Sequence, residues 1–125
     1  MCYEETLNSI LMWNNKGITM TTVICTYQLP VPKSREQVMA IFKMAAETVF
    51  KDLDGLNSKQ FCYDETTGKG LSVYNWISKD AAEQFFYSPD FVKNFEAGLG
   101  TIPNLEILDA LLVVDNRVGD ITINE

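Results

Sequence analysis

Three side chains that could hold an aromatic ligand alternate along one short stretch of the chain, from Leu71 to Ile77. Ser72, Tyr74 and Trp76 occupy every second position, which in a β-strand places them on one face. An indole ring stacks on planar aromatic molecules, and the hydroxyls of serine and tyrosine can bond a ligand hydroxyl or carbonyl. The pattern therefore predicts a pocket for a planar aromatic ligand that stacks on Trp76.

The preceding strand-like segment, residues 56–65, supplies two further candidates for the same face. If the turn between the strands leaves an even number of residues unpaired, Tyr63 lies opposite Ser72 and Phe61 lies opposite Tyr74. This register separates an aromatic, polar-tipped face from an aliphatic one. A slip of one residue would invert the assignment.

Thr26, from the more polar face of the first strand, completes the candidate set. The predicted substrate-binding residues are therefore Trp76, Tyr74, Ser72, Tyr63, Phe61 and Thr26. The same aromatic face could instead pack against a second copy of the chain. Both interpretations stay open, because an exposed aromatic sheet face serves either a ligand or a partner.

Histidine is absent from the chain, which removes several kinds of catalytic and metal site. Serine and cysteine nucleophiles paired with histidine, histidine-ligated zinc or iron, and proximal-histidine haem are all excluded. A calcium loop at Asp52 is excluded too, because Gly55 comes two positions too early and Tyr63 stands where the last acidic ligand belongs. We expect no metal and no cofactor. The ionisable candidates for a general base are Tyr27, Tyr63 and Tyr74.

The three cysteines, Cys2, Cys25 and Cys62, have no paired spacing. We interpret them as buried thiols of a protein in a reducing compartment. Cys62 lies beside aromatic residues, yet no histidine is present to lower the pKa of its thiol. A structural role is therefore favoured over a nucleophilic one.

The charge balance argues against nucleic acid and membrane surfaces as partners. Ten Lys and Arg residues against 17 Asp and Glu give a net charge of −7, and the basic residues are scattered singly. A phosphate backbone or an anionic membrane would be repelled. The first residues carry Glu4 and Glu5 where a secretory signal needs positive charge, so we expect a cytoplasmic protein.

Hydrophobic periodicity places these candidates in an alternating series of strands and helices. Ser34 and Gln37 form a capping-box spacing at the start of the longest helix, and Gly55 suits its left-handed end. The predicted elements are a strand at 21–29, a helix at 34–53, strands at 56–65 and 71–77, helices starting at Ser78 and Ser88, and a strand at 105–114. This order predicts an α+β, ferredoxin-like β-α-β-β-α-β domain with a four-stranded antiparallel sheet. Both helical segments are expected to lie on the same face of this sheet.

In that arrangement one face of the sheet is left uncovered, and we expect the aromatic face to be the uncovered one. The predicted domain spans residues 20–115, preceded by an extension at 1–19. The strand at 105–114 is apolar on both faces apart from Glu106 and Asp109, which predicts burial between layers or at a subunit contact. The tail at 116–125 has alternating isoleucines and could add a strand to a sheet edge of a partner. These features together predict a homodimer.

The segment YNWISKDAA at 74–82, preceded by Asp54-Gly55-Leu56, resembles the dimeric α/β-barrel proteins of the antibiotic-biosynthesis-monooxygenase type, closest to YdhR-like monooxygenases. The likeness covers about residues 20 to 115. It implies that two ferredoxin-like chains join sheet to sheet. Trp76 matches a tryptophan that lines the substrate cavity in that family, whereas Tyr74 lies where many members carry a glutamate.

Some members of that family oxygenate polycyclic phenols without metal or flavin. The resemblance therefore implies a cofactor-independent monooxygenase acting on a small aromatic or quinone-like substrate. A non-catalytic dimer that binds a small ligand, or serves as a structural partner, remains an alternative on the same fold. A muconolactone-type isomerase is a third, since fold alone does not rank these functions.

Overall fold

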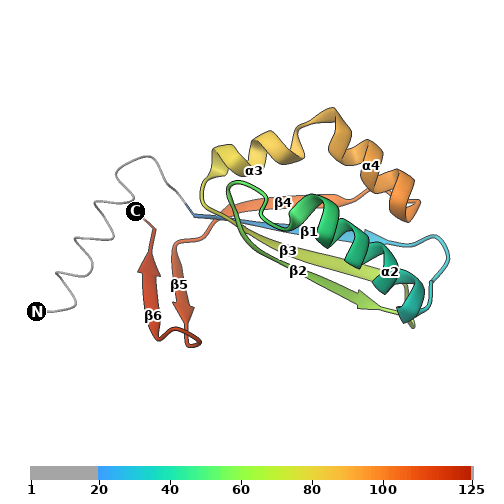
Figure 1. Cartoon of the computed structure of the whole chain (residues 1–125), viewed down its shortest axis with the longest axis horizontal. Coiled ribbons are helices and arrows are strands. Elements are labelled where there is room, and N and C mark those ends of the chain that lie inside the picture. The colour runs from blue at the N-terminus through green and yellow to red at the C-terminus, as the bar shows by residue number, and fades with distance from the viewer. Residues whose placement is uncertain (1–19, 125) are drawn as a thin grey trace, which may run out of the picture.

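The computed structural model describes residues 20–124, and the predicted extension at 1–19 lies outside the described residues, as does Cys2. Four strands form an antiparallel sheet in the order β2-β3-β1-β4, and helices cover one of its faces (Figure 1). A separate two-stranded hairpin follows the sheet. In chain order the elements are β1 (Thr21–Gln28), α2 (Arg35–Ala45), η1 (Ala46–Phe50), β2 (Leu56–Asp64), β3 (Lys69–Trp76), α3 (Lys79–Phe86), α4 (Pro89–Leu99), β4 (Asn104–Asp109), β5 (Leu112–Asp115) and β6 (Asp120–Ile123). The predicted α+β, ferredoxin-like fold is confirmed.

The predicted helix starts are confirmed at their capping residues. Ser34 and Gln37 form the full capping box at the start of α2, with the Ser34 hydroxyl accepting from the Gln37 amide and the Gln37 side chain accepting from the Ser34 amide. The hydroxyl of Ser78 accepts from the Ala81 amide, 3.1 Å away, and begins α3. Ser88 caps α4 in the same way, so the two short helices are fixed where the sequence places them.

The long helix departs from its prediction after Ala45. Its last turn, η1, is a π-helix, closed by a bond of 2.8 Å from the Lys51 amide to the Ala46 carbonyl. The Thr48 hydroxyl donates to the Met44 carbonyl at 2.7 Å, an interaction that competes with regular backbone bonding. Widened helical turns of this kind often border functional sites.

Few side chains of this helix are fully buried. Within α2 and η1 only Val38 is fully buried, and Val49 is 44% exposed. Phe42 and Phe50 are half-buried and pack against the buried core. Both also line a hollow, so the helix contacts the core and borders a cavity at the same time.

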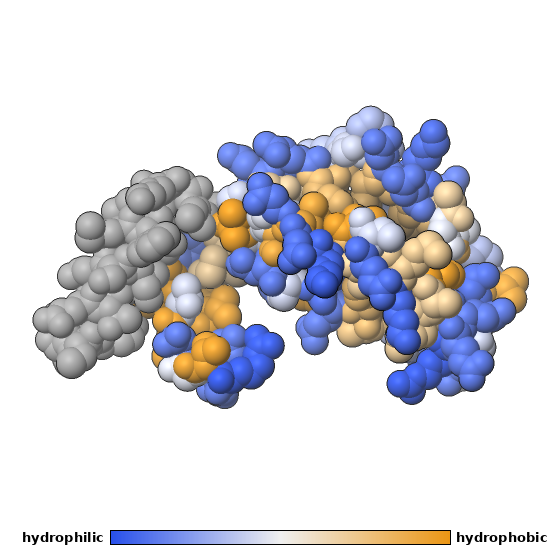
Figure 2. Space-filling view, in the orientation of Figure 1, coloured by the Kyte–Doolittle hydropathy of each residue, from blue (hydrophilic) through white to orange (hydrophobic). Residues whose placement is uncertain are grey.

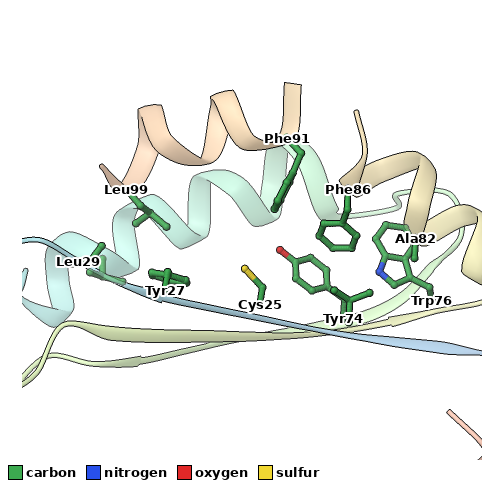
Figure 3. Packing of buried hydrophobic residues seen from close by; sticks show 11 residues of the cluster. Cys25, Tyr27, Leu29, Tyr74, Trp76, Ala82, Phe86, Phe91 and Leu99 are labelled. Carbon is green, nitrogen blue, oxygen red and sulfur yellow. The ribbon is translucent and has the colours of Figure 1, made fainter. Parts of the chain in front are cut away.

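The aromatic face of the sheet is covered, and the prediction that it would be open is wrong. Val23 of β1 pairs with Tyr74, so the buried side of β1 and the aromatic side of β3 form one face. Tyr74 and Trp76 are 1% and 2% exposed, packed beneath Phe86 (Figure 3). The large rings bury more apolar area than Leu71 and the other aliphatic side chains behind them, which favours this face for the core.

The strand pairing keeps the predicted faces with a register shifted by two residues. Phe61 lies opposite Ser72 and Tyr63 lies opposite Gly70, where the prediction placed Tyr63 opposite Ser72. A shift by two preserves which side chains share a face. The ring of Tyr27 crosses Gly70 so closely that a Cβ at this position would overlap it, which explains why a residue without a side chain stands there.

The last predicted strand is broken into two. β4 ends at Asp109, and β5 and β6 form a hairpin that extends beyond the sheet (Figure 1). Leu111 is 71% exposed, so the expected burial between layers is not present in the chain by itself. The alternating isoleucines of the tail do form a strand, but it pairs with β5 of its own chain.

The two described cysteines differ in their surroundings. Cys25 is buried on the helix-covered face, as predicted, whereas Cys62 is exposed. Cys62 pairs with Leu71 and lies on the uncovered face of the sheet, where no described element shields it. The expectation of a buried thiol at Cys62 is therefore wrong.

Candidate functional site

A cavity of about 670 Å³ lies between the helices and the covered face of the sheet. One wall comes from α2 and η1, the other from α3 and α4, and side chains of β1, β2 and β3 form the floor. Apolar side chains show between more hydrophilic ones over these elements (Figure 2). The volume falls within the range of roughly 300–1,000 Å³ that is typical of small-molecule sites, and the lining is mostly apolar and aromatic.

Three of the predicted site residues line this cavity. Ser72 and Tyr74 of β3 form part of its floor, together with Phe61 of β2. Period-two alternation along paired strands brings them to the same face, and Phe61 lies directly opposite Ser72. The sequence therefore identified part of a real cavity, although it placed that cavity on an open face.

The other three predicted residues do not line it. Trp76 packs against Phe85 and Phe86, with ring centroids 5.5 and 5.8 Å away, and is part of the core. Tyr63 lines a second, smaller hollow of about 290 Å³. Its hydroxyl is held by the backbone of Lys33, donating to the carbonyl at 2.8 Å and accepting from the amide at 2.9 Å.

Thr26 lies on the opposite face of the sheet. It pairs with Leu71, whose side chain points away from the helices because Ser72 points toward them. The prediction that Thr26 shares a pocket with Tyr74 is therefore wrong. Its cause is the grouping of residues by polarity rather than by strand alternation.

A lysine that the sequence analysis did not single out enters the cavity from β2. The Lys59 ammonium lies over three rings, 3.6 Å from the centroid of Phe50, 3.8 Å from Phe61 and 4.5 Å from Tyr74. Regular alternation with Phe61 places Lys59 opposite Tyr74 on the covered face, and the β-bulge between Leu56 and Ser58 comes before this regular stretch. The alternating positions of Lys59 and Phe61 are the signal that could have revealed it.

Burial shifts the pKa of Lys59, Tyr27 and Tyr74, which line the cavity, and of Cys25 beside them. It lowers the pKa of Lys59 to about 7, an effect that the nearby Cys25 opposes. Burial raises the pKa of the Cys25 thiol to about 11, with Lys59 opposing. The pKa values of Tyr74 and Tyr27 are raised as well, first by burial and then by Cys25. Both phenols stay protonated near neutral pH, so neither suits the role of general base.

One buried polar atom on the cavity wall has no hydrogen-bond partner among the described residues. This is the hydroxyl of Tyr27, a residue that is 6% exposed and lines the cavity. A buried hydroxyl without a partner is costly unless another molecule bonds it. The Tyr74 hydroxyl also points along the inside of the sheet toward Cys25 (Figure 3). The floor can therefore offer hydroxyl donors to a ligand oxygen.

The described part of the chain, residues 20–124, contains neither a cluster of metal-ligating side chains nor a helix that could span a membrane. Within this part of the chain, no cluster of three or more metal-ligating side chains occurs. None of the helices there has the length and apolar character needed to cross a membrane.

Solved structures of the same fold include enzymes that use oxygen. A mutant of the cofactor-independent oxygenase SnoaB from Streptomyces nogalater matches with a TM-score of 0.59 and 12% identity, over 78% of this chain and 99% of that one. A protein from Caulobacter crescentus named as an antibiotic biosynthesis monooxygenase matches with a TM-score of 0.57 and 24% identity, over 79% and 97%. The monooxygenase ActVA-Orf6 from Streptomyces coelicolor, in complex with nanaomycin D, matches with a TM-score of 0.52 and 17% identity, over 78% and 91%.

These likenesses show the fold. No protein-family model matches the chain, and no curated protein matches it by sequence. Each structural match covers nearly the whole of the other chain, so the resemblance concerns an entire domain rather than a shared fragment.

Proposed function

We propose that the protein is a cofactor-independent monooxygenase that acts on a small aromatic or quinone-like substrate in the cavity above the sheet. The observation that carries the proposal is the cavity itself, which is large, apolar and ringed by aromatic side chains. It has hydroxyl groups and one amine on its floor. Aromatic walls favour a planar ligand, and the polar groups can fix its oxygen atoms.

The structural neighbours support this class of reaction. SnoaB is described as a cofactor-independent oxygenase and ActVA-Orf6 as a monooxygenase, on the same fold. Fold by itself does not determine a reaction, so the support rests on fold and cavity together.

The proposed reaction needs no external reductant. A substrate hydroxyl or enol loses its proton, the resulting anion transfers an electron to O₂, and the two radicals combine at a carbon that still bears one hydrogen. The peroxide formed there takes up the proton and becomes a hydroperoxide. Loss of water then leaves a carbonyl, so one oxygen atom enters the substrate and the other leaves as water. The substrate supplies both electrons. An apolar cavity assists by keeping bulk water from the reactive anion.

Ligand binding and oxygen uptake test the proposal. Purified protein would be screened by thermal shift and tryptophan quenching against phenols, anthrones, naphthoquinones and lactones, and hits would be assayed with an oxygen electrode in the presence of EDTA. We expect an anthrone or naphthol to bind and to be oxidised without added metal or flavin. Binding without turnover would instead favour the ligand-binding alternative. Turnover of a lactone alone would favour an isomerase.

We also propose that the protein is a homodimer joined through the uncovered face of the sheet. Ile24 and Val73 are adjacent on that face, and no described element covers them. A polar network, in which Thr22 donates to Asn75 and Asn75 donates to Ser58, lies on the same face and could fix the register of the contact. The exposed apolar side chains of the β5–β6 hairpin provide a second surface that a partner would bury.

Sedimentation should show a dimer at micromolar concentration, and Val73→Glu should shift it to monomer by placing a charge in the contact. Val92→Glu is the matched control, since Val92 is 40% exposed on α4, away from this face and from the cavity lining. A wild-type protein that sediments as a monomer would contradict the dimer. A Val73→Glu variant that remains a folded dimer would contradict the uncovered sheet face as the site of the contact.

A further inference from the structure

The Lys59 amine has no acidic partner in the described structure, although it lies in a largely apolar cavity. The ion pairs within residues 20–124 do not include it, and its closest described surroundings are the rings of Phe50, Phe61 and Tyr74. Among the described residues, the one other charged side chain on the cavity wall is Asp90, at the start of α4. A buried amine without a carboxylate is an expensive feature, which suggests that it serves a ligand.

The groups that face this amine cannot take over its role. From β1 it faces the Cys25 thiol and, further along the cavity, the Tyr27 phenol, and from β3 it faces the Tyr74 phenol. Burial raises the pKa of all three, so they remain neutral near pH 7. Asp90 is an exposed carboxylate at a helix N-terminus, where negative charge is favoured.

We propose that Lys59 is the proton acceptor of the site and that the ligand is a phenol, enol or hydroxyquinone, held as its anion beside the Lys59 ammonium. This inference rests on the proposed function insofar as the ligand must occupy the cavity. The proton moves from the ligand oxygen to Nζ of Lys59, so a neutral pair becomes an ammonium and an oxygen anion. No electron is transferred in this step.

The surroundings favour this transfer in two ways: they make the free amine available before it, and they stabilise the ammonium after it. Burial lowers the pKa of Lys59 to about 7, so the free amine that can accept a proton is far more populated at neutral pH than for an exposed lysine. Once formed, the ammonium is stabilised by the faces of Phe50 and Phe61 and by the adjacent anion, whose attraction is strong in an apolar cavity. The unpartnered Tyr27 hydroxyl, which also lines the cavity, is a further hydrogen-bond donor for an oxygen atom of the ligand.

The ionisation state of a bound phenol tests the inference without any need for turnover. The probe is 7-hydroxycoumarin, whose neutral and anionic forms absorb at different wavelengths, at pH 7, where the free molecule is mainly neutral. In the wild-type protein we expect the anion. In Lys59→Met, which keeps the length and apolar stem of the side chain, we expect the ratio of bound anion to bound neutral phenol to fall by a factor of about ten or more. Lys51→Met, an exposed lysine outside the cavity, is the control and should match wild type.

Proton release on binding separates a base from a fixed positive charge. Lys59→Arg keeps the charge but cannot accept a proton, so the phenol must lose its proton to the buffer. Calorimetry in buffers of different ionisation enthalpy should show about one proton released per ligand by Lys59→Arg, and about half or less by wild type.

The possible outcomes distinguish this inference from the proposed function. If the wild-type protein binds no 7-hydroxycoumarin, the proposal that the cavity binds aromatic ligands is contradicted, and the inference about Lys59 falls with it. Binding of the neutral phenol contradicts the inference alone. Equal proton release by wild type and Lys59→Arg would show that Lys59 acts through its charge, which also overturns the role of proton acceptor.

Discussion

Replacing Gly98 by tryptophan should block the cavity and weaken binding of an aromatic ligand by about 100-fold, or about 2.7 kcal/mol. Gly98 lies near the end of α4, on the cavity wall, and a Cβ built there meets no described atom within 4 Å. The first atom of a larger side chain therefore fits without a clash, and we expect the indole to lie across the cavity. Because glycine is unfavourable inside a helix, the substitution should leave stability unchanged or slightly higher.

The measurement is a binding isotherm for the best ligand of the screen, recorded by calorimetry because the variant adds a fluorophore. Ala97→Trp is the matched control, because Ala97 is the preceding exposed residue of α4 and does not line the cavity. It should bind as wild type does. Unchanged affinity in a folded Gly98→Trp variant would place the ligand elsewhere.

Replacing Trp76 by alanine should destabilise the protein by about 3–5 kcal/mol, the usual cost of removing a fully packed large aromatic side chain. Trp76 is 2% exposed and lies among the rings of Tyr74, Phe85 and Phe86. The effect should appear in urea unfolding as a lower midpoint with an unchanged slope. Any weaker ligand binding would follow from this loss of stability, since Trp76 does not line the cavity.

Tyr87→Ala provides the contrast for this substitution. Tyr87 immediately follows α3 but is 68% exposed, so its removal should change stability by less than about 0.5 kcal/mol. If Trp76→Ala were as stable as Tyr87→Ala and lost ligand affinity, the tryptophan would be a binding residue on an open face. That outcome would support the sequence-based prediction that Trp76 stacks on an aromatic ligand.

Much of the fold follows from local chemistry that can be read along the chain. Capping residues at Ser34, Ser78 and Ser88 fixed three helix starts, because each supplies an oxygen to amides that no backbone carbonyl can reach. Alternation along β3 correctly grouped Ser72 with Tyr74. The π-turn after Ala45 and the break between β4 and β5 were not predicted from the sequence pattern.

Part of the candidate site was predictable from the alternation of side chains along the strands, and part was not. Ser72, Tyr74 and Phe61 share a face because side chains alternate in any strand, but alternation says nothing about what covers that face. Their exposure depends on where α3 and α4 pack. Lys59 was missed because a charged residue in a strand is ordinarily assigned to solvent, although alternation from Phe61 places it on the covered face.

The sequence by itself determined the order of strands and helices as far as β4, the alternation of side chains along β2 and β3, and the absence of histidine. These depend on local backbone geometry and on composition. Only the tertiary structure decided which face the helices cover, that Trp76 belongs to the core, and that an amine lies over three rings in a cavity of about 670 Å³. The physical reason is that burial, and with it the pKa of Lys59, is set by the packing of segments distant in the chain.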